Sequence, residues 1–563
     1  MSIRFLATTT IAAVTVVLVS AAAAWADAAD GLRITEFMAI NDGTLVDEDG
    51  DRSDWIEIHN PTAEAIDLTG WHLTDDVAEL DKWAFPAVSL DSGAYLVVFA
   101  SDKDRRDGAG ELHTSFKLSG DGEYLALVRP DGDTVVHAYP PVSHIADVSY
   151  GLLGDMQAGY FAVPTPGEAN AAGALGFVDA PEIDAGRGFY DAPFNVTITC
   201  PTAGAVIRYT TDGTAPSESF GTVYAPGTPI PITTTTTLLA VAARAGYATS
   251  PVAARTYIFL DDVIAQGNDQ SARGMPATWV TKSGYVRTAD YEMDTNVVND
   301  AAYAPIMRDV LTAIPTLSIV MDVDDLFDQY TGIYANPNEY AHPELWERPA
   351  SVEYFDAHGG PQFHVVCGAR ISGELARHPD VNSKYSFRLL FKEQYGPGKL
   401  EFPFFSDSDI DEYNTIVFRA TYGNSWMNIY RGNDGDASAL YIRNQFGHDC
   451  LRDAGHLASA GGYCHLYLNG VYWGLYNPNE RPDDAFMAAH VGGDREQWDI
   501  IQGQLNYDGN LKSGSRASYD AMMALVASSS PISDAGYQQL KQYPDIEEFI
   551  DYIIINIFIC NYD

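Results

Sequence analysis

The chain has 563 residues, 46% hydrophobic and 20% charged, so it is too long for one core and too apolar to be largely disordered. It carries 77 Asp and Glu against 33 Lys and Arg, a formal net charge of −44. A negative field of this size repels phosphate backbones and anionic lipid heads, which disfavours nucleic-acid and membrane-surface partners. It is compatible with divalent cations, cationic partners or a salty medium.

Residues 1–26 have the layout of a secretory signal peptide. Arg4 precedes an apolar stretch near residues 6–19, and the small-x-small site Ala24-Trp25-Ala26 follows. The sequence therefore predicts cleavage after Ala26 and an exported protein, secreted or at the cell surface, without a membrane span. An uncleaved membrane anchor is the alternative, although the apolar stretch is short for one.

Five cysteines are few for an exported chain of this size, so disulfides cannot be its main scaffold. Cys450 and Cys464 are close enough in sequence to close a small loop. Cys560 lies in an apolar run and is expected to be a buried thiol. The odd count leaves at least one cysteine unpaired, and the pairing stays open.

Residues 31–168 show short alternating strands between turn residues. Residues 95–101 (YLVVFAS) read as a strand, and residues 123–139 read as a hairpin around Pro130-Asp131-Gly132. Many short strands at near-regular spacing indicate a β-sandwich.

The segments DWIEIHNP and LTGWHLTDD in this region resemble the lamin-tail domain of secreted bacterial proteins. The resemblance implies an Ig-like sandwich used for attachment or assembly, without catalysis. We expect Trp55, Ile56 and Ile58 to pack inward.

The acidic loop DEDGDRSDW suggests a structural Ca²⁺ site, because Asp47, Asp49, Asp51 and Asp54 offer clustered oxygens. The loop lacks the helix–loop–helix calcium spacing and its terminal bidentate Glu. A solvated turn is the alternative.

Residues 178–260, which follow an Ala- and Gly-rich linker, repeat the strand pattern in a smaller region and predict a second sandwich of Ig-like size. The segment IRYTTDGTAP resembles the C-terminal domain of chitobiase and related hexosaminidases, an accessory module in that family. We expect Tyr190, Phe194 and Tyr209 to belong to the core rather than to a sugar-binding platform.

Residues 261–563 mix strands with helical periodicity and predict an α+β domain. Several strands are expected in residues 334–391, and apolar residues recur at helical spacing in residues 437–455 and 545–559. Only this region is expected to hold an enzyme cleft.

From about Ile314 to the end, this region resembles the CotH family of spore-coat and surface proteins, most specifically in NGVYWGLYNPNER. The resemblance implies a protein-kinase-like fold that uses ATP and Mg²⁺ or Mn²⁺ to phosphorylate secreted or surface proteins. The residues at metal positions are unknown.

Phosphoryl transfer needs a backbone cradle and a cation on the phosphates. Gly368 and Gly373, in GARISGE, could let backbone approach the phosphates, although a plain hairpin is the alternative. Lys384, in SKYSFRLLF, matches the lysine that the resemblance places on the phosphates. Arg388 and Lys392 are competing cations, and Lys384 as a surface strand lysine is the alternative.

Phosphoryl transfer also needs an acid to hold the lysine and a carboxylate for the nucleophile. Glu480 is expected to hold Lys384, with Arg481 on a phosphate, and a helix-capping role is the alternative for Glu480. Asn561 and Asp563 match the start of the family's catalytic-loop motif, with Asp563 as the catalytic carboxylate. The resemblance implies a chain cut at this loop, inactive as it stands, with residues 553–559 exposing an apolar patch.

Two hypotheses remain open. The first is an exported kinase-like phosphotransferase that two sandwich modules attach to an envelope or matrix component. The second is a non-catalytic surface or adhesion protein on a kinase-like scaffold, since fold does not guarantee chemistry. Carbohydrate processing is a distant third, suggested only by the second sandwich.

Overall fold

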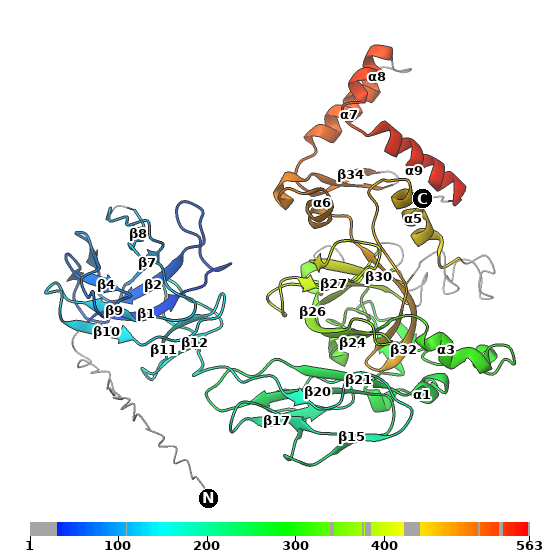
Figure 1. Cartoon of the computed structure of the whole chain (residues 1–563), viewed down its shortest axis with the longest axis horizontal. Helices are drawn as coiled ribbons and strands as arrows, with labels where there is room; N and C mark the ends of the chain where they lie inside the picture. The colour runs from blue at the N-terminus through cyan, green and yellow to red at the C-terminus, as the bar shows by residue number, and fades with distance from the viewer. Residues whose placement is uncertain are drawn as a thin grey trace, which may run out of the picture. The chain divides into compact units, whose positions relative to one another are not determined.

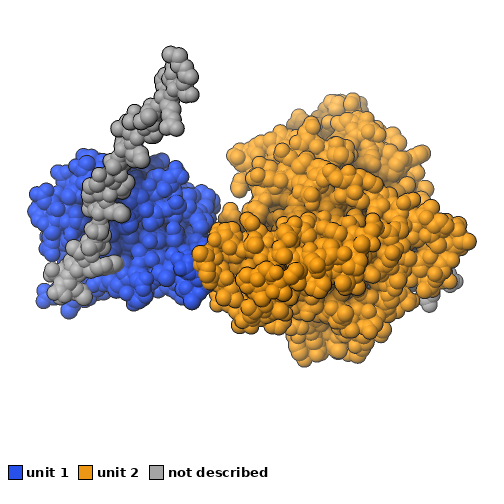
Figure 2. All heavy atoms as spheres, turned by 60° about the horizontal axis from the view of Figure 1, so that its bottom comes forward, with its two compact units in different colours: residues 1–178, 244–248 blue, residues 179–243, 249–563 orange. Residues whose placement is uncertain are grey.

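The computed structural model describes residues 31–108, 110–337, 343–373, 377, 384–420, 440–504, 507–528 and 533–560. The predicted signal peptide, Asn561 and Asp563 lie outside the described residues. The chain divides into two compact units, shown in Figure 2. Unit 1 comprises Met1–Val178 and Arg244–Ala248, and unit 2 comprises Asp179–Ala243 and Thr249–Asp563.

Unit 1 is a β-sandwich (Figure 1), which confirms the prediction for this region. One sheet has the order β12-β11-β1-β2-β7-β8 and the other β10-β9-β4-β5, and β3 pairs with β6. Side chains of both sheets share one core, as Ile34 and Ile56 of the first and Leu73 and Leu127 of the second show. The strands are β1 (Arg33–Met38), β2 (Asp54–His59), β3 (Ile66–Asp67), β4 (His72–Thr74), β5 (Trp83–Ala84), β6 (Ser89–Leu90), β7 (Tyr95–Ala100), β8 (Leu112–His113), β9 (Leu125–Val128), β10 (Val135–Tyr139), β11 (Ser149–Leu152) and β12 (Ala158–Phe161).

Strand β2 contains Trp55, Ile56 and Ile58, the three residues that were predicted to pack inward. Successive side chains of a strand point to opposite faces of the sheet. Ile56 and Ile58 belong to the main core, whereas Trp55 packs in a separate cluster with Met38 and Phe99. Trp55 is buried as predicted, but in a different cluster from the two isoleucines.

The second sandwich begins unit 2 (Figure 1) and confirms the predicted fold class. Its main sheet has the order β14-β21-β20-β17-β18, and two strand pairs, β13-β16 and β15-β19, accompany it. Tyr190 and Phe194 stack at 4.0 Å, and both rings meet the buried Tyr257 edge-on. The strands are β13 (Glu182–Ile183), β14 (Gly188–Phe189), β15 (Phe194–Val196), β16 (Ile198–Thr199), β17 (Val206–Thr210), β18 (Thr222–Val223), β19 (Ile230–Ile232), β20 (Thr236–Ala243) and β21 (Ala253–Ile258).

The third region is built on a closed barrel of seven strands in the order β24-β25-β26-β27-β30-β32-β31. Strands β24 and β31 close it in parallel, and the other neighbouring pairs are antiparallel. Its interior is a large core that includes Ile319, Phe387 and Phe418. The barrel strands are β24 (Thr316–Val320), β25 (Arg348–Phe355), β26 (Phe363–Ser372), β27 (Ser386–Leu390), β30 (Thr415–Arg419), β31 (Cys464–Leu468) and β32 (Val471–Glu480). The remaining strands pair as β22 (Thr278–Val280) with β23 (Val286–Thr288), β28 (Leu400–Glu401) with β29 (Glu412–Tyr413), and β33 (Ile500–Gln504) with β34 (Tyr507–Ser513).

Helices precede, interrupt and follow the barrel strands, so the region is α+β as predicted. Both helices expected from periodicity form, as α5 (Arg443–Asp453) and α9 (Ile546–Phe558). The side chain of Asp545 caps α9 by accepting from the N–H groups of Glu547 and Glu548. The other helices are α1 (Leu260–Ile264), α2 (Thr295–Val298), α3 (Met307–Thr312), α4 (Val323–Phe327), α6 (Asp484–Val491), α7 (Ala517–Ser528) and α8 (Asp534–Leu540).

Helix α9 exposes much of its apolar surface, as predicted for its C-terminal half. Ile557 and Phe558 are 72% and 73% exposed. Cys560, just beyond the helix, is also exposed, so the expectation of a buried thiol was wrong. Cys450 and Cys464 are free thiols and form no disulfide. Among the described residues, no helix combines the length and apolarity that crossing a bilayer requires.

The second sandwich and the barrel are joined by a buried ion pair. Arg187 Nε lies 2.8 Å from Oε1 of Glu353 on β25, and Glu353 is fully buried. Beside it, the hydroxyls of Thr256 on β21 and Ser318 on β24 are 2.7 Å apart. Burial raises the pKa of Glu353, which Arg187 opposes.

Candidate functional site

Four neighbouring barrel strands reach the same end of the barrel. In the strand register Gly368 on β26 faces Leu390 on β27, and Leu390 faces Thr415 on β30. Ile416, the next residue of β30, faces Glu480 at the end of β32. We call this end of the barrel the pocket rim, defined by Gly368, Leu390, Thr415 and Glu480.

A pocket of about 420 Å³ opens at the pocket rim, within the size range of small-molecule sites. Its wall combines apolar side chains of α6 with charged groups from the segment before β30. The lining residues are Lys399, Asp409, Ile410, Asp411, Glu412, Tyr413, Asn414, Thr415, Glu480, Arg481, Asp483, Ala485, Phe486, Ala488, Ala489 and Arg495. Two predicted cofactor-binding residues, Glu480 and Arg481, are therefore among them.

The Glu480 carboxylate is buried and fixed from two sides. One oxygen accepts from the backbone N–H of Ala460 at 2.8 Å, and the other lies 2.9 Å from Nε2 of His490. His490 in turn packs on the ring of Phe486, with centroids 4.4 Å apart. Glu480 is thus a rigid part of the pocket wall.

Three cations line the pocket, each beside a carboxylate. Lys399 lies 2.7 Å from Glu412, and Arg481 lies 3.3 Å from Asp483. Arg495 contacts Asp484 at 3.1 Å. The same lining holds the carboxylates of Asp409, Asp411, Glu412, Glu480 and Asp483, so an anionic ligand would need these cations together with a metal ion.

A further cation–carboxylate pair stands at the pocket rim. Lys392 Nζ lies 2.8 and 3.0 Å from the two oxygens of Glu347. The Glu347 side chain is 1% exposed, whereas Lys392 is 43% exposed. A Cβ on Gly368 would come within 2.8 Å of Glu347 Oε1 and 2.6 Å of the Tyr395 ring, so a larger residue there would displace one of these side chains. Gly368 therefore makes room for this pair.

Lys384 and Gly373 lie at the opposite end of the barrel. Ser372 faces Ser386 in the register, which places Gly373 and Lys384 just beyond that pair. Lys384 donates to the carbonyl of Trp473 and lies 5.6 Å from its ring centroid. Burial lowers the pKa of Lys384 to about 8, although the charge of Asp290 opposes this.

The structure does not form the predicted ion pair between Lys384 and Glu480. Lys384 is five register positions from the level of Glu480, about 16 Å along the strands at 3.3 Å per residue. Glu480 is bound instead by Ala460 and His490. The predicted cofactor set is thus split, with Gly368, Glu480 and Arg481 at one end and Gly373 and Lys384 at the other.

Asn561 and Asp563 lie outside the described residues, but the chain just before them can be placed. A Cβ on Gly447 of α5 would meet Ile559 at 2.9 Å, so the end of α9 lies against α5. Gln445 of α5 accepts from the side-chain amide of Asn479, the residue before Glu480.

Two residues that hold side chains near the pocket rim could not be predicted from sequence: Glu347, which binds Lys392, and His490, which binds Glu480. Glu347 stands in the segment LWERPA, and His490 falls in the last turn of α6. Each acquires its partner only when distant segments meet. The sequence offers one signal for this site, the cation Lys392 downstream of Lys384.

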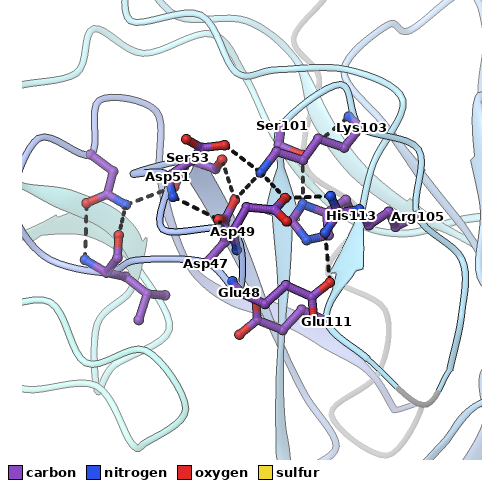
Figure 3. A network of polar contacts seen from close by, with 12 residues as sticks. Asp47, Glu48, Asp49, Asp51, Ser53, Ser101, Lys103, Arg105, Glu111 and His113 are labelled. Carbon is purple, nitrogen blue, oxygen red and sulfur yellow. Dashed lines mark hydrogen bonds and ion pairs between the residues drawn. The ribbon is translucent and has the colours of Figure 1, made fainter.

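The acidic loop of unit 1 holds a lysine in its centre (Figure 3). Asp47, Asp49 and Asp51 bring their carboxylates together, and Lys103 Nζ lies 2.7, 2.7 and 2.8 Å from them. Burial opposes ionisation of Asp47, but hydrogen bonds from Lys103 and Ser53 outweigh it and lower its pKa to about 2. The position proposed for Ca²⁺ is thus taken by an ammonium group.

Asp54, the fourth candidate calcium ligand, does not join the cluster. It begins β2, and its carboxylate accepts from the backbone N–H of Leu118 at 3.3 Å. Burial raises its pKa to about 7.

Replacing Lys103 with Met should destabilise unit 1 by about 3 kcal/mol, because Asp47 would remain buried and charged beside two other carboxylates. Millimolar Ca²⁺ should then restore part of the melting temperature, since the three carboxylates would be free for a divalent ion. Scanning calorimetry with and without Ca²⁺ measures both effects. Arg105→Met, which removes the exposed contacts to Glu48 and Asp49, should cost under about 1 kcal/mol. Equal losses in the two variants would contradict the assignment.

Comparisons with known proteins give the three families that the sequence resembles, in the same order along the chain. Residues 26–142 match the lamin tail domain, residues 185–254 the chitobiase/beta-hexosaminidase C-terminal domain, and residues 370–563 the CotH kinase protein. No curated protein matches the chain. The fibronectin(III)-like modules of Clostridium thermocellum CbhA are 9% identical, with 41% of this chain and 90% of that chain covered, and a TM-score of 0.15, too low to carry an argument.

Proposed function

We propose that the protein is an exported kinase-like phosphotransferase that moves phosphate from ATP to secreted or surface proteins. The observation that carries this proposal is the match of residues 370–563 to the CotH kinase protein, a span that includes Glu480, Arg481 and the other residues that line the pocket. The two sandwich modules would serve attachment to an envelope or matrix component. Export rests on the signal-like sequence of residues 1–26.

The pocket offers groups of the kind that Mg-ATP requires. Phe486 and Ile410 provide apolar surface for a base, and the lining cations can contact phosphate oxygens. Asp409 and Asp411 are pocket carboxylates able to hold Mg²⁺ or Mn²⁺, which prefer oxygen ligands. When bound, the metal ion would neutralise charge on the phosphates.

The chain's own residues would then position the reactants. Glu480, fixed by Ala460 and His490, keeps the pocket wall rigid, and Lys392 places an ammonium group at the rim. In the transfer, the acceptor hydroxyl bonds to the γ-phosphorus as the bond to the β–γ bridging oxygen breaks and ADP leaves. Asp563, proposed from the family resemblance, would take the hydroxyl proton.

Mg-ATP binding to the pocket is the direct test. Mg-ATP in large excess over its Kd should stabilise the protein by about 2–4 kcal/mol in thermal unfolding. Arg495→Gln should weaken the effect, because Arg495 lines the pocket. Arg516→Gln is the matched control, an arginine similarly paired with an aspartate, Asp520, and absent from the pocket lining.

Transfer of labelled phosphate to surface proteins by the full-length parent tests the activity itself. Nucleotide-dependent stabilisation together with labelled acceptor protein would support the proposal. Unfolding temperatures that do not respond to Mg-ATP, with no transfer, would favour a non-catalytic surface or adhesion protein instead.

A further inference from the structure

Two carboxylates lie opposite each other inside unit 1. Glu36 on β1 and Glu57 on β2 are direct cross-strand partners, and both are fully buried. Buried carboxylates are usually paired with a cation or neutralised by a proton. The hydrogen-bond partners recorded for these two in the described part of the chain are neutral N–H and O–H donors.

Most of these donors belong to one segment, residues 164–170, which we call the strap. Glu36 accepts from the backbone N–H of Thr165 at 3.1 Å and from its hydroxyl at 2.7 Å. Glu57 accepts from the backbone N–H of Gly167 at 2.7 Å. Asn170 adds two hydrogen bonds of 2.9 Å, to the carbonyls of Thr35 and Leu152.

The strap follows β12, and the chain after the strap pairs with β12 again. There, Tyr160 and Ala174 exchange backbone hydrogen bonds of 2.7 and 2.8 Å. Between these points, the two carboxylates hold the strap on the sandwich. Two negative charges at neighbouring buried positions oppose each other, so the pair is favourable when one member carries a proton. Thr35 Oγ1 lies 2.5 Å from Glu57 Oε1, a separation at which the hydroxyl can donate to a carboxylate or accept from a carboxyl.

We propose that Glu36 and Glu57 form a proton-operated latch that holds the strap closed in acid and loosens it toward neutral pH. Burial raises the pKa of Glu57 to about 7, and the charge of Glu36 adds to the rise. In the opened strap, where Glu57 meets water, its pKa returns toward the ordinary value near 4.3. A raised pKa in the closed form means that closure binds a proton, so its stabilising effect falls as pH rises between these two values.

Asp54, which begins the same strand as Glu57, also has a pKa that burial raises to about 7, but its carboxylate accepts from Leu118 and not from the strap. Burial lowers the pKa of His137, whose ring meets Tyr139, to about 4. The charge of Glu57 acts on Tyr95 of β7, and the charge of Glu36 acts on Tyr139 of β10, which lies beside Tyr150 of β11. Tyrosines ordinarily titrate near pH 10, and burial raises the pKa of all three further. Glu168, the strap's own carboxylate, is exposed and serves as a control.

Hydrogen exchange of the strap peptide in the intact protein tests the latch. After correction for the intrinsic exchange rate, protection should fall about ten- to a hundredfold from pH 5 to pH 7 and then level off. In Glu57→Gln the amide can still accept from Gly167 and donate to Thr35, so protection should no longer depend on pH. Glu168→Gln should behave like the wild type.

Glu36→Gln provides a second route if Glu57→Gln fails to fold. Removing the neighbouring charge should move the fall in protection to lower pH, because that charge helps to raise the pKa of Glu57. A flat wild-type profile from pH 5 to pH 7 would overturn the proposal. So would a Glu57→Gln profile with the wild-type slope, or a Glu36→Gln profile with an unmoved midpoint.

Discussion

Arg187→Met is expected to lower the free energy of unfolding of unit 2 by about 3–5 kcal/mol, the usual cost of removing one partner of a buried ion pair. Arg187 lies 2.8 Å from Glu353, whose side chain is 0% exposed, so the variant leaves a carboxylate in the junction without its cation. The loss should appear in denaturant unfolding followed by hydrogen exchange of β25. Because the pair joins the second sandwich to the barrel, strands of both modules should lose protection together.

Two variants make this result specific. Arg187→Met combined with Glu353→Leu removes both charges, and it should recover most of the stability, because a well-packed apolar pair can replace a buried ion pair. Arg208→Met is the control within the same sandwich. Arg208 donates to the carbonyls of Glu218 and Gly221 and has no partner recorded across the junction. A similar small loss in Arg187→Met and Arg208→Met would show that the pair does not hold the modules together.

Much of the fold could be predicted because its signals are local. Alternation and turn residues identified both sandwiches, and the hairpin around Pro130-Asp131-Gly132 forms between β9 and β10. Helical spacing placed α9 to within a residue at each end. Closure of the barrel was not predicted, because it depends on the pairing of β24 with β31, which are about 150 residues apart.

The candidate site was predicted only in part, for the same physical reason. Glu480 and Arg481 belong to a continuous segment that ends one strand, and both line the pocket. The choice of Lys384 over Lys392 required knowing which strand end meets the pocket. That depends on the strand register. The two lysines flank β27, eight residues apart, and their sequence does not show which end of β27 lies at the pocket.

Lys392→Met should lower phosphotransfer by about 10²–10³-fold if the proposed function holds, since a fixed cation near developing phosphate charge has effects of this order. Lys392 is held by both oxygens of Glu347 yet remains 43% exposed, and it follows Leu390, whose register partner Thr415 lines the pocket. Lys384→Met should leave transfer within a few-fold of wild type, because Lys384 lies at the far end of the barrel against Trp473. Initial rates of the full-length parent with labelled ATP would measure both.

Loss of folding must be separated from loss of chemistry, because Lys392→Met leaves Glu347 buried without its closest cation. Lys392→Met combined with Glu347→Gln removes that charge and should unfold near the wild-type temperature while remaining inactive. Activity in this double variant, or inactivity of a folded Lys384→Met protein, would indicate that Lys384, and not Lys392, binds the phosphates. The comparison therefore decides which end of the barrel holds the nucleotide.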